Sequence, residues 1–140
     1  MSRIFWDTNP YIYLFEAHPQ FEPPTRALRQ RMLQRKDTLL TSAMTLAEVQ
    51  VKPLRSGNTA LAQRLRDLVR QSSDVLPFNE SAADIFARLR LNPSIRPADA
   101  MQLSTAAAAG VELFITNDTS LHKLTIPGIH FICSVERAPI

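Results

Sequence analysis

The chain has 140 residues, of which 45% are apolar and 21% charged, a composition typical of a folded domain with its own core rather than a disordered chain. The net charge is only +3, with 13 arginines and 3 lysines, so a basic surface is expected without any strongly charged tract. The single cysteine, Cys133, excludes an internal disulfide, and no apolar run approaches the roughly 18 residues of a membrane span, so we expect a cytoplasmic protein.

The first half of the chain alternates short apolar runs with longer amphipathic segments. In chain order it predicts a strand, two helices, a second strand and two further helices, at residues 3–6, 10–17, 24–36, 38–43, 44–55 and 58–72. The helix at 44–55 contains Pro53, which weakens that helix because proline cannot donate a backbone hydrogen bond.

The second half continues the alternation. It predicts a strand, two helices, a strand, a short helix and a last strand, at residues 75–78, 80–91, 97–110, 112–116, 120–124 and 129–133. The helix at 97–110 ends on Gly110, a residue type favoured after helix C-termini. Strands alternating with helices indicate a parallel sheet covered on both faces. We therefore expect one α/β domain over residues 1–140, a three-layer α/β/α sandwich with about five parallel strands.

Two acidic residues in the first half of the chain have ordinary structural explanations. Asp7 follows the first predicted strand, and either Asp7 or Asn9 can cap a helix whose first position is Pro10. Glu48 ends the sequence Thr45-Leu46-Ala47-Glu48, which matches a capping box with Thr45 as the cap. Taken one at a time, both acids are better explained as helix caps than as parts of a site.

Two further acids also have structural explanations, but the four together indicate a site. Asp99 lies in a first helical turn, where the helix dipole favours a carboxylate, and Asp118 can cap the short helix at 120–124. In the predicted parallel sheet, however, all four acids fall at the edge formed by the carboxyl ends of the strands, where such folds bind ligands. Carboxylates brought together repel one another unless a cation joins them, and oxygen ligands favour Mg²⁺ or Mn²⁺.

Other chemistries fit the sequence less well. Its glycines, Gly57, Gly110 and Gly128, are too few and too far apart to build a phosphate-binding glycine loop. The histidines are scattered and no nucleophile-elbow motif is present, so neither a zinc site nor a serine triad is expected. A phosphatase that forms an aspartyl-phosphate usually has a second aspartate two positions after the first, where this chain has Asn9.

The segments that carry the acids resemble a known family. They are IFWDTNPYIYLF, TSAMTLAEV, RPADAMQLSTAAAAGVELFITND and SLHKLTIPGIHF. They contain, in order, D-T-N, then T-L-A-E, then A-D-A with a small-residue helix and a glycine, and finally T-N-D. This ordered set resembles the PIN-domain family, especially its VapC-type toxin ribonucleases from bacterial toxin–antitoxin pairs. The resemblance runs from the first predicted strand to the last.

The resemblance implies a metal-dependent endoribonuclease that cleaves RNA phosphodiester bonds and leaves a 5′-phosphate and a 3′-hydroxyl. The positions that match the family's catalytic, Mg²⁺- or Mn²⁺-binding acids are Asp7, Glu48, Asp99 and Asp118. Polar positions near the metal are matched by Thr8, Asn9 and Thr116. Without those four acids, 16 basic residues stand against 9 acidic ones, a balance that suits a polyanionic substrate.

The resemblance also implies partners. Family members usually form homodimers and are inhibited by an antitoxin protein, so we expect RNA, an antitoxin and a second copy of the chain as partners, and no membrane. Arg64 and Arg70 are interpreted first as part of a solvated helix face, although they suit RNA or an antitoxin. Two alternatives remain open: a catalytically silent PIN-like module that binds RNA or protein, and a metal-dependent phosphatase acting on small molecules.

Overall fold

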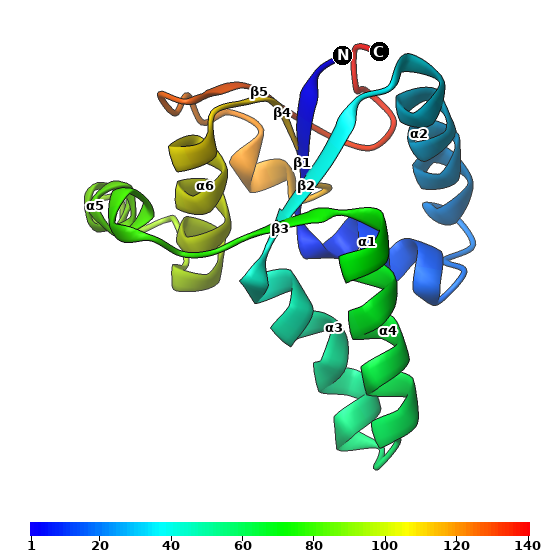
Figure 1. Cartoon of the computed structure of the whole chain (residues 1–140). Helices are drawn as coiled ribbons and strands as arrows, with labels where there is room; N and C mark the ends of the chain where they lie inside the picture. Colours follow the sequence, from blue (N-terminus) through cyan, green and yellow to red (C-terminus); the bar gives the residue numbers. More distant parts are fainter.

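The computed structural model describes residues 1–140, which fold around one β-sheet. Its strands are β1 (Arg3–Trp6), β2 (Thr38–Ser42), β3 (Asp74–Leu76), β4 (Val111–Ile115) and β5 (Ile129–Cys133). The five strands are all parallel and lie in the order β3-β2-β1-β4-β5, which confirms the predicted parallel sheet (Figure 1). The order reverses at β1 and β4, so the carboxyl end of β1 lies at the switch point of the sheet.

Six α-helices connect the strands, and each corresponds to a predicted helix. They are α1 (Thr8–Phe15), α2 (Glu22–Arg35), α3 (Ala43–Arg55), α4 (Thr59–Ser72), α5 (Glu80–Leu89) and α6 (Pro97–Ala109). The short helix expected at 120–124 is instead a single 3-10 turn at Thr119–Leu121. No helix has both the length and the apolar character needed to cross a membrane.

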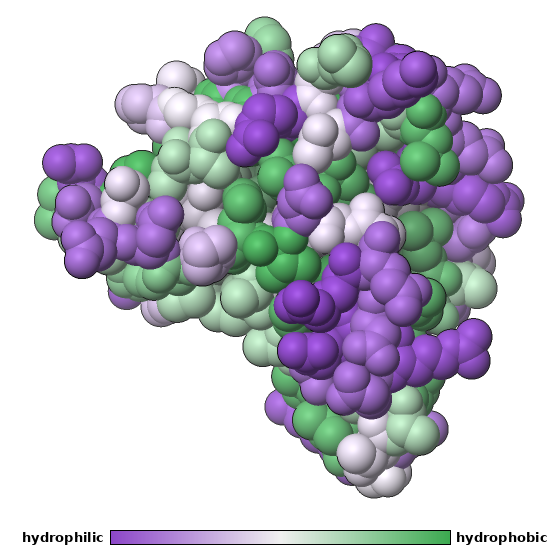
Figure 2. Space-filling view, viewed as in Figure 1, coloured by the Kyte–Doolittle hydropathy of each residue, from purple (hydrophilic) through white to green (hydrophobic).

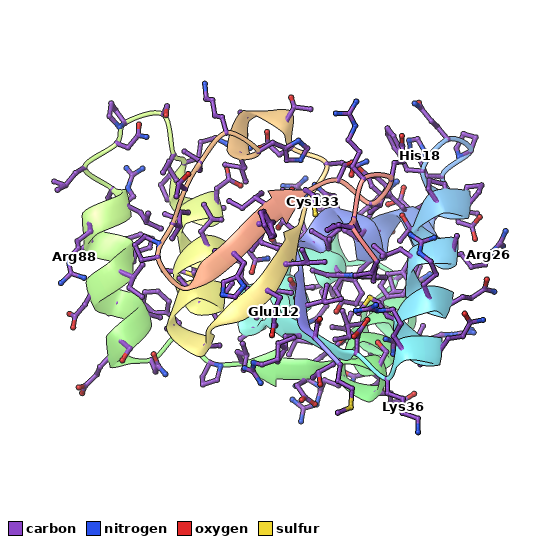
Figure 3. All side chains as sticks on the ribbon, turned by 90° about the horizontal axis from the view of Figure 1, so that it is seen from above. His18, Arg26, Lys36, Arg88, Glu112 and Cys133 are labelled. Atoms are coloured by element: carbon purple, nitrogen blue, oxygen red, sulfur yellow. The ribbon has the colours of Figure 1, made fainter.

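The helices cover both faces of the sheet and give the expected three layers. On one face, apolar residues of β1, β2 and β4 pack with residues of α1 to α4, including Leu28, Met32 and Val69. On the other face, Phe5 and Phe114 stack with ring centroids 5.1 Å apart and pack with α6, with α5 on its outer side. Seen from above, Arg88 on α5 and Arg26 on α2 lie at opposite outer sides of the molecule (Figure 3). Helices α3 and α4 pack together and project below the sheet (Figure 1).

The structure corrects the start of α1. The helix begins at Thr8 rather than Pro10, and Asp7 is its N-cap because the Asp7 carboxylate accepts a 2.8 Å hydrogen bond from the Thr8 backbone N–H. The expectation that Asp7 can cap this helix is therefore confirmed, while Asn9 lies within the first turn.

The structure also shows that the predicted capping box of α3 is wrong. Helix α3 follows β2 without a loop, and its N-cap is Ser42, whose hydroxyl accepts a 3.1 Å hydrogen bond from Met44 N–H. Thr45 is consequently the third residue of the helix and buried, and Glu48 accepts a hydrogen bond from Thr8 instead. The predicted strand at 75–78 is also shorter, because β3 ends at Leu76, before Pro77.

Candidate active site

The four predicted acids line a single cavity of about 250 Å³ at the carboxyl edge of the sheet. Asp7 ends β1, Glu48 lies in the middle of α3, Asp99 lies in the first turn of α6, and Asp118 follows β4. The rest of the lining comes from Thr8, Asn9, Ile12, Arg96, Ala98 and Gln102. The predicted convergence of the four acids is therefore observed, and it follows from a parallel sheet whose carboxyl ends all face one side.

Asp7 is the most enclosed of the four acids, with 8% of its surface exposed. Its Oδ1 accepts from the Thr8 backbone N–H at 2.8 Å, and its Oδ2 accepts from the Thr116 hydroxyl at 2.8 Å. The pKa of Asp7 is raised to about 6, mainly by burial and to a smaller extent by the charges of Asp99 and Glu48, while the two hydrogen bonds partly offset this rise. A carboxyl group that resists ionisation in this way would gain from a nearby cation.

Glu48 is oriented by a residue of another helix. The Thr8 hydroxyl donates a 2.6 Å hydrogen bond to Glu48 Oε1, and Thr8 Oγ1 in turn accepts from Gln102 Nε2 at 3.1 Å. This chain of hydrogen bonds joins α1, α3 and α6 at the floor of the cavity. Thr8, which the sequence places near the site only through family resemblance, therefore positions one of the acids.

Gln102 is a central residue of the site that the sequence analysis missed. It is 2% exposed, its Nε2 also donates to Thr45 Oγ1 at 2.9 Å, and its Oε1 accepts from the Ser42 hydroxyl. A buried amide of this kind holds elements in register because each lost hydrogen bond would leave a polar atom unpaired. A sequence signal exists: Gln102 follows Asp99 by three residues and so shares its helix face.

Asp99 and Asp118 lie at the more open rim of the cavity and share one arginine. Arg96, the N-cap residue of α6, donates from Nε to Asp99 Oδ2 at 3.1 Å and from Nη2 to Asp118 Oδ2 at 3.3 Å. Asp118 also caps the 3-10 turn, since its Oδ1 accepts from Ser120 N–H at 3.0 Å. The predicted structural roles of Asp99 and Asp118 at helix starts are therefore real, and they coexist with their position in the cavity.

The polar residues expected near the acids also lie in or beside the cavity. Thr116 is fully buried at the end of β4 and bonds Asp7, and its Oγ1 also accepts from Asp118 N–H at 3.2 Å. Asn9 lines the cavity and accepts a weak, 3.4 Å hydrogen bond from Asn117 N–H. These contacts tie the loop after β4 to the start of α1.

The donor set of this cavity fits a hard divalent cation. Its candidate ligands are carboxylate oxygens with no histidine or cysteine, as Mg²⁺ and Mn²⁺ prefer. In the present conformation no three His, Cys, Asp or Glu side chains are close enough together to hold a metal ion. Each acid instead accepts a hydrogen bond from the protein, and Arg96 holds one oxygen of Asp99 and one oxygen of Asp118.

Comparison with known families identifies the domain. The family model of the PIN domain matches residues 4–126, which include every residue that lines the cavity and four of the five strands. The chain belongs to the PIN-domain family. Among curated proteins, none matches this PIN domain.

Solved structures similar to this PIN domain come from VapBC complexes. VapBC2 from Rickettsia felis, bound to a promoter DNA fragment, gives a TM-score of 0.71 at 19% identity, covering 94% of this chain and 97% of that one. DNA-bound VapBC from Salmonella typhimurium gives a TM-score of 0.68 at 22% identity, covering 96% of this chain and 99% of that one. VapBC-1 from nontypeable Haemophilus influenzae gives a TM-score of 0.67 at 21% identity, covering 84% of this chain and 87% of that one. At these identities the similarity shows that this PIN domain shares their fold over nearly its whole length.

Proposed function

We propose that this PIN domain is a metal-dependent endoribonuclease and the toxin of a type II toxin–antitoxin pair. The observation that carries the proposal is that four carboxylates from separate segments of the chain line one cavity. Membership of the PIN family supports it, and so does the similarity to solved VapBC toxin–antitoxin complexes. The catalytic, metal-binding residues we propose are Asp7, Glu48, Asp99 and Asp118.

The chemistry requires a cation and ionised acids. Mg²⁺ or Mn²⁺ held by these carboxylates would offset charge on a scissile phosphate and lower the pKa of an attacking water. Asp7, with a pKa of about 6, is largely ionised at neutral pH even before a cation binds. Thr116 and the Thr8 backbone N–H hold both of its oxygens in place, while the Thr8 hydroxyl fixes one oxygen of Glu48. Asp99 and Asp118 complete the set of four carboxylates, and their position at the rim would place them next to the bound RNA.

The exposed surface of α4 carries basic side chains that suit RNA as the substrate. Hydrophilic side chains gather over α4, in the lower right of the molecule (Figure 2). Arg64 and Arg70 are exposed residues of that helix, and neither forms an ion pair. Unpaired arginines bind phosphate oxygens well because the guanidinium group donates two parallel hydrogen bonds. The same arginines also suit an acidic segment of a protein partner.

An apolar groove beside the acids supports the antitoxin as a partner. The groove, of about 210 Å³, lies between α1, α3 and α4 and shares Ile12 and Glu48 with the acidic cavity. Its apolar walls are formed by Ile12, Phe15, Val49, Pro53, Leu61 and Leu65. We propose that a segment of the antitoxin occupies this groove and blocks access to the acids, and that the toxin itself forms a homodimer.

Cleavage of RNA by the purified protein tests the proposed function. Single-stranded RNA should be cut with Mg²⁺ or Mn²⁺ and remain intact with EDTA, and Asp99→Asn should lose most of this activity. Asp84→Asn is a matched control, because Asp84 is an exposed acid of α5 outside the cavity. Uncut RNA under all metal conditions would instead favour a silent binding module. Hydrolysis of a generic phosphate ester without RNA cleavage would favour a phosphatase.

A further inference from the structure

Arg96 is the one basic residue that lines the acidic cavity. Its guanidinium group bridges Asp99 Oδ2 and Asp118 Oδ2, at 3.1 and 3.3 Å, and so joins the start of α6 to the segment after β4. The proposed metal would draw on the same two carboxylates. Arg96 and a divalent cation would therefore compete for the same two carboxylates.

The geometry of Arg96 suits a group that can be displaced. Its side chain is 74% exposed, whereas those of Asp99 and Asp118 are 14% and 24% exposed. An ion pair with one such exposed partner contributes little to folding stability, because water and salt screen it. A divalent cation carries twice the charge of a guanidinium group in a smaller volume, so it binds converging carboxylates more strongly.

We propose that Arg96 is an internal counter-cation of the metal-free site that a divalent cation displaces, and that the displaced guanidinium then binds a phosphate oxygen of the RNA. This inference rests on the proposed function, since it takes the same cavity as the site of RNA cleavage. Arg96 remains at the rim after displacement because its backbone is fixed at the N-cap of α6. The planar guanidinium can exchange two carboxylate oxygens for two phosphate oxygens without loss of hydrogen bonds.

The first experiment measures metal affinity without RNA. Calorimetric titration with Mn²⁺ compares the wild type with Arg96→Gln, with Arg96→Lys and with Arg88→Gln as the control. Arg88 is exposed on the outer side of α5 and forms no ion pair (Figure 3). We expect Arg96→Gln to bind Mn²⁺ about two- to fivefold more tightly than the wild type, because the competing cation is gone. Arg96→Lys should give an intermediate affinity, and Arg88→Gln no change.

The opposite result has a clear meaning. If Arg96 only orients Asp99 and Asp118 for the metal, Arg96→Gln should bind Mn²⁺ more weakly, and that result, or an unchanged affinity, overturns the proposal. A thermal melt of each variant in EDTA confirms that the comparison is made between folded proteins. Arg96→Lys, which keeps the positive charge, provides the same test if Arg96→Gln does not fold.

The second experiment measures RNA binding with the metal in place. A short single-stranded RNA is titrated at saturating Ca²⁺ over a series of salt concentrations, and a gel confirms that the RNA remains intact. Loss of one phosphate contact in Arg96→Gln should weaken binding and reduce the slope of log affinity against log salt by about 0.7. An unchanged affinity and slope overturns the proposal.

The two experiments distinguish failure of this inference from failure of the proposed function. The Mn²⁺ titration requires no catalysis, so tighter binding by Arg96→Gln would stand even if the wild type failed to cut RNA. In that case the proposed function alone fails. An active wild type together with Arg96→Gln that matches it in both titrations would overturn only the role of Arg96.

Discussion

Thr8 and Glu48 lie 40 residues apart in the chain, and the Thr8 hydroxyl donates a 2.6 Å hydrogen bond to Oε1 of Glu48. The same hydroxyl accepts from the buried amide of Gln102. Thr8 therefore stands between a carboxylate that must face the cavity and an amide that fixes three elements. This relationship makes Thr8 a residue whose loss should affect both the fold and the activity.

Thr8→Val removes the hydroxyl while keeping the shape of the side chain. It leaves Gln102 Nε2 with one acceptor fewer and frees Glu48 to rotate, so unfolding should become easier by about 1–3 kcal/mol. Ribonuclease activity should fall as well, because Glu48 loses its fixed orientation. Thr8→Ser retains the hydroxyl and is the control. Equal free energies of unfolding for the two variants in urea would show that these hydrogen bonds do not stabilise the fold.

Asp7→Asn separates the cap from the catalytic role. Asparagine caps helices about as well as aspartate, so metal-free stability should hold or rise as four crowded acids become three. RNA cleavage and metal affinity should fall by orders of magnitude, since one negative charge leaves the proposed cation site. The measurements are a cleavage assay with Mg²⁺, a Mn²⁺ titration and a melt in EDTA. Wild-type cleavage by this variant would mean that Asp7 is a cap only.

The raised pKa of Asp7 predicts how metal-free stability changes with pH. The pKa of the Asp7 carboxyl group is about 6 in the folded state, against an ordinary value of 3.8. The folded state therefore binds more protons than the unfolded state between pH 4 and 6, and its stability falls as pH rises through this window. The loss attributable to Asp7 is on the order of 2–3 kcal/mol. In EDTA, Asp7→Asn should lack this part of the pH dependence in denaturant unfolding.

The chain offers a matched pair of glycines for a test of the fold. Gly128 has φ of +99°, and a Cβ there would collide with the Ala107 backbone carbonyl, whereas Gly57 has φ of +74° and open space around it. Gly57→Ala should cost about 1–2 kcal/mol, from the left-handed backbone alone. Gly128→Ala should cost about 2–5 kcal/mol, because backbone at the end of α6 must also shift. Equal melting temperatures would contradict the close approach of Gly128 to α6.

The proposed function predicts that the protein associates with a second copy of itself and with an antitoxin. We expect a dimer in sedimentation at high concentration, and a tighter complex with the antitoxin that suppresses RNA cleavage. Leu61→Glu places a charge in the wall of the apolar groove and should weaken antitoxin binding while leaving the acids intact. An antitoxin that binds Leu61→Glu and the wild type equally must bind a different surface.

Sequence reasoning predicted the sheet and the four acids because strand period and position after a strand are local properties. It misassigned the cap of α3, because T-L-A-E acts as a capping box only if Thr45 is the N-cap. The true start at Ser42 depends on β2 running directly into α3. Arg96 and Gln102 were missed for a related reason. The spacing from Asp99 places Gln102 on the same helix face, but no residue spacing encodes the segments that the side chains of Arg96 and Gln102 contact.

The hydrogen bonds of Gln102 to Ser42, Thr8 and Thr45 have a consequence for how the protein opens. These residues lie at the end of β2, the start of α1 and the first turns of α3, so none of these elements can detach while the amide stays buried. Hydrogen-bonded backbone amides in these three elements should therefore exchange with solvent only through global unfolding, as slowly as those of the central strands. The cavity would then exist before any ligand arrives, and inactivation by heat would be abrupt rather than gradual.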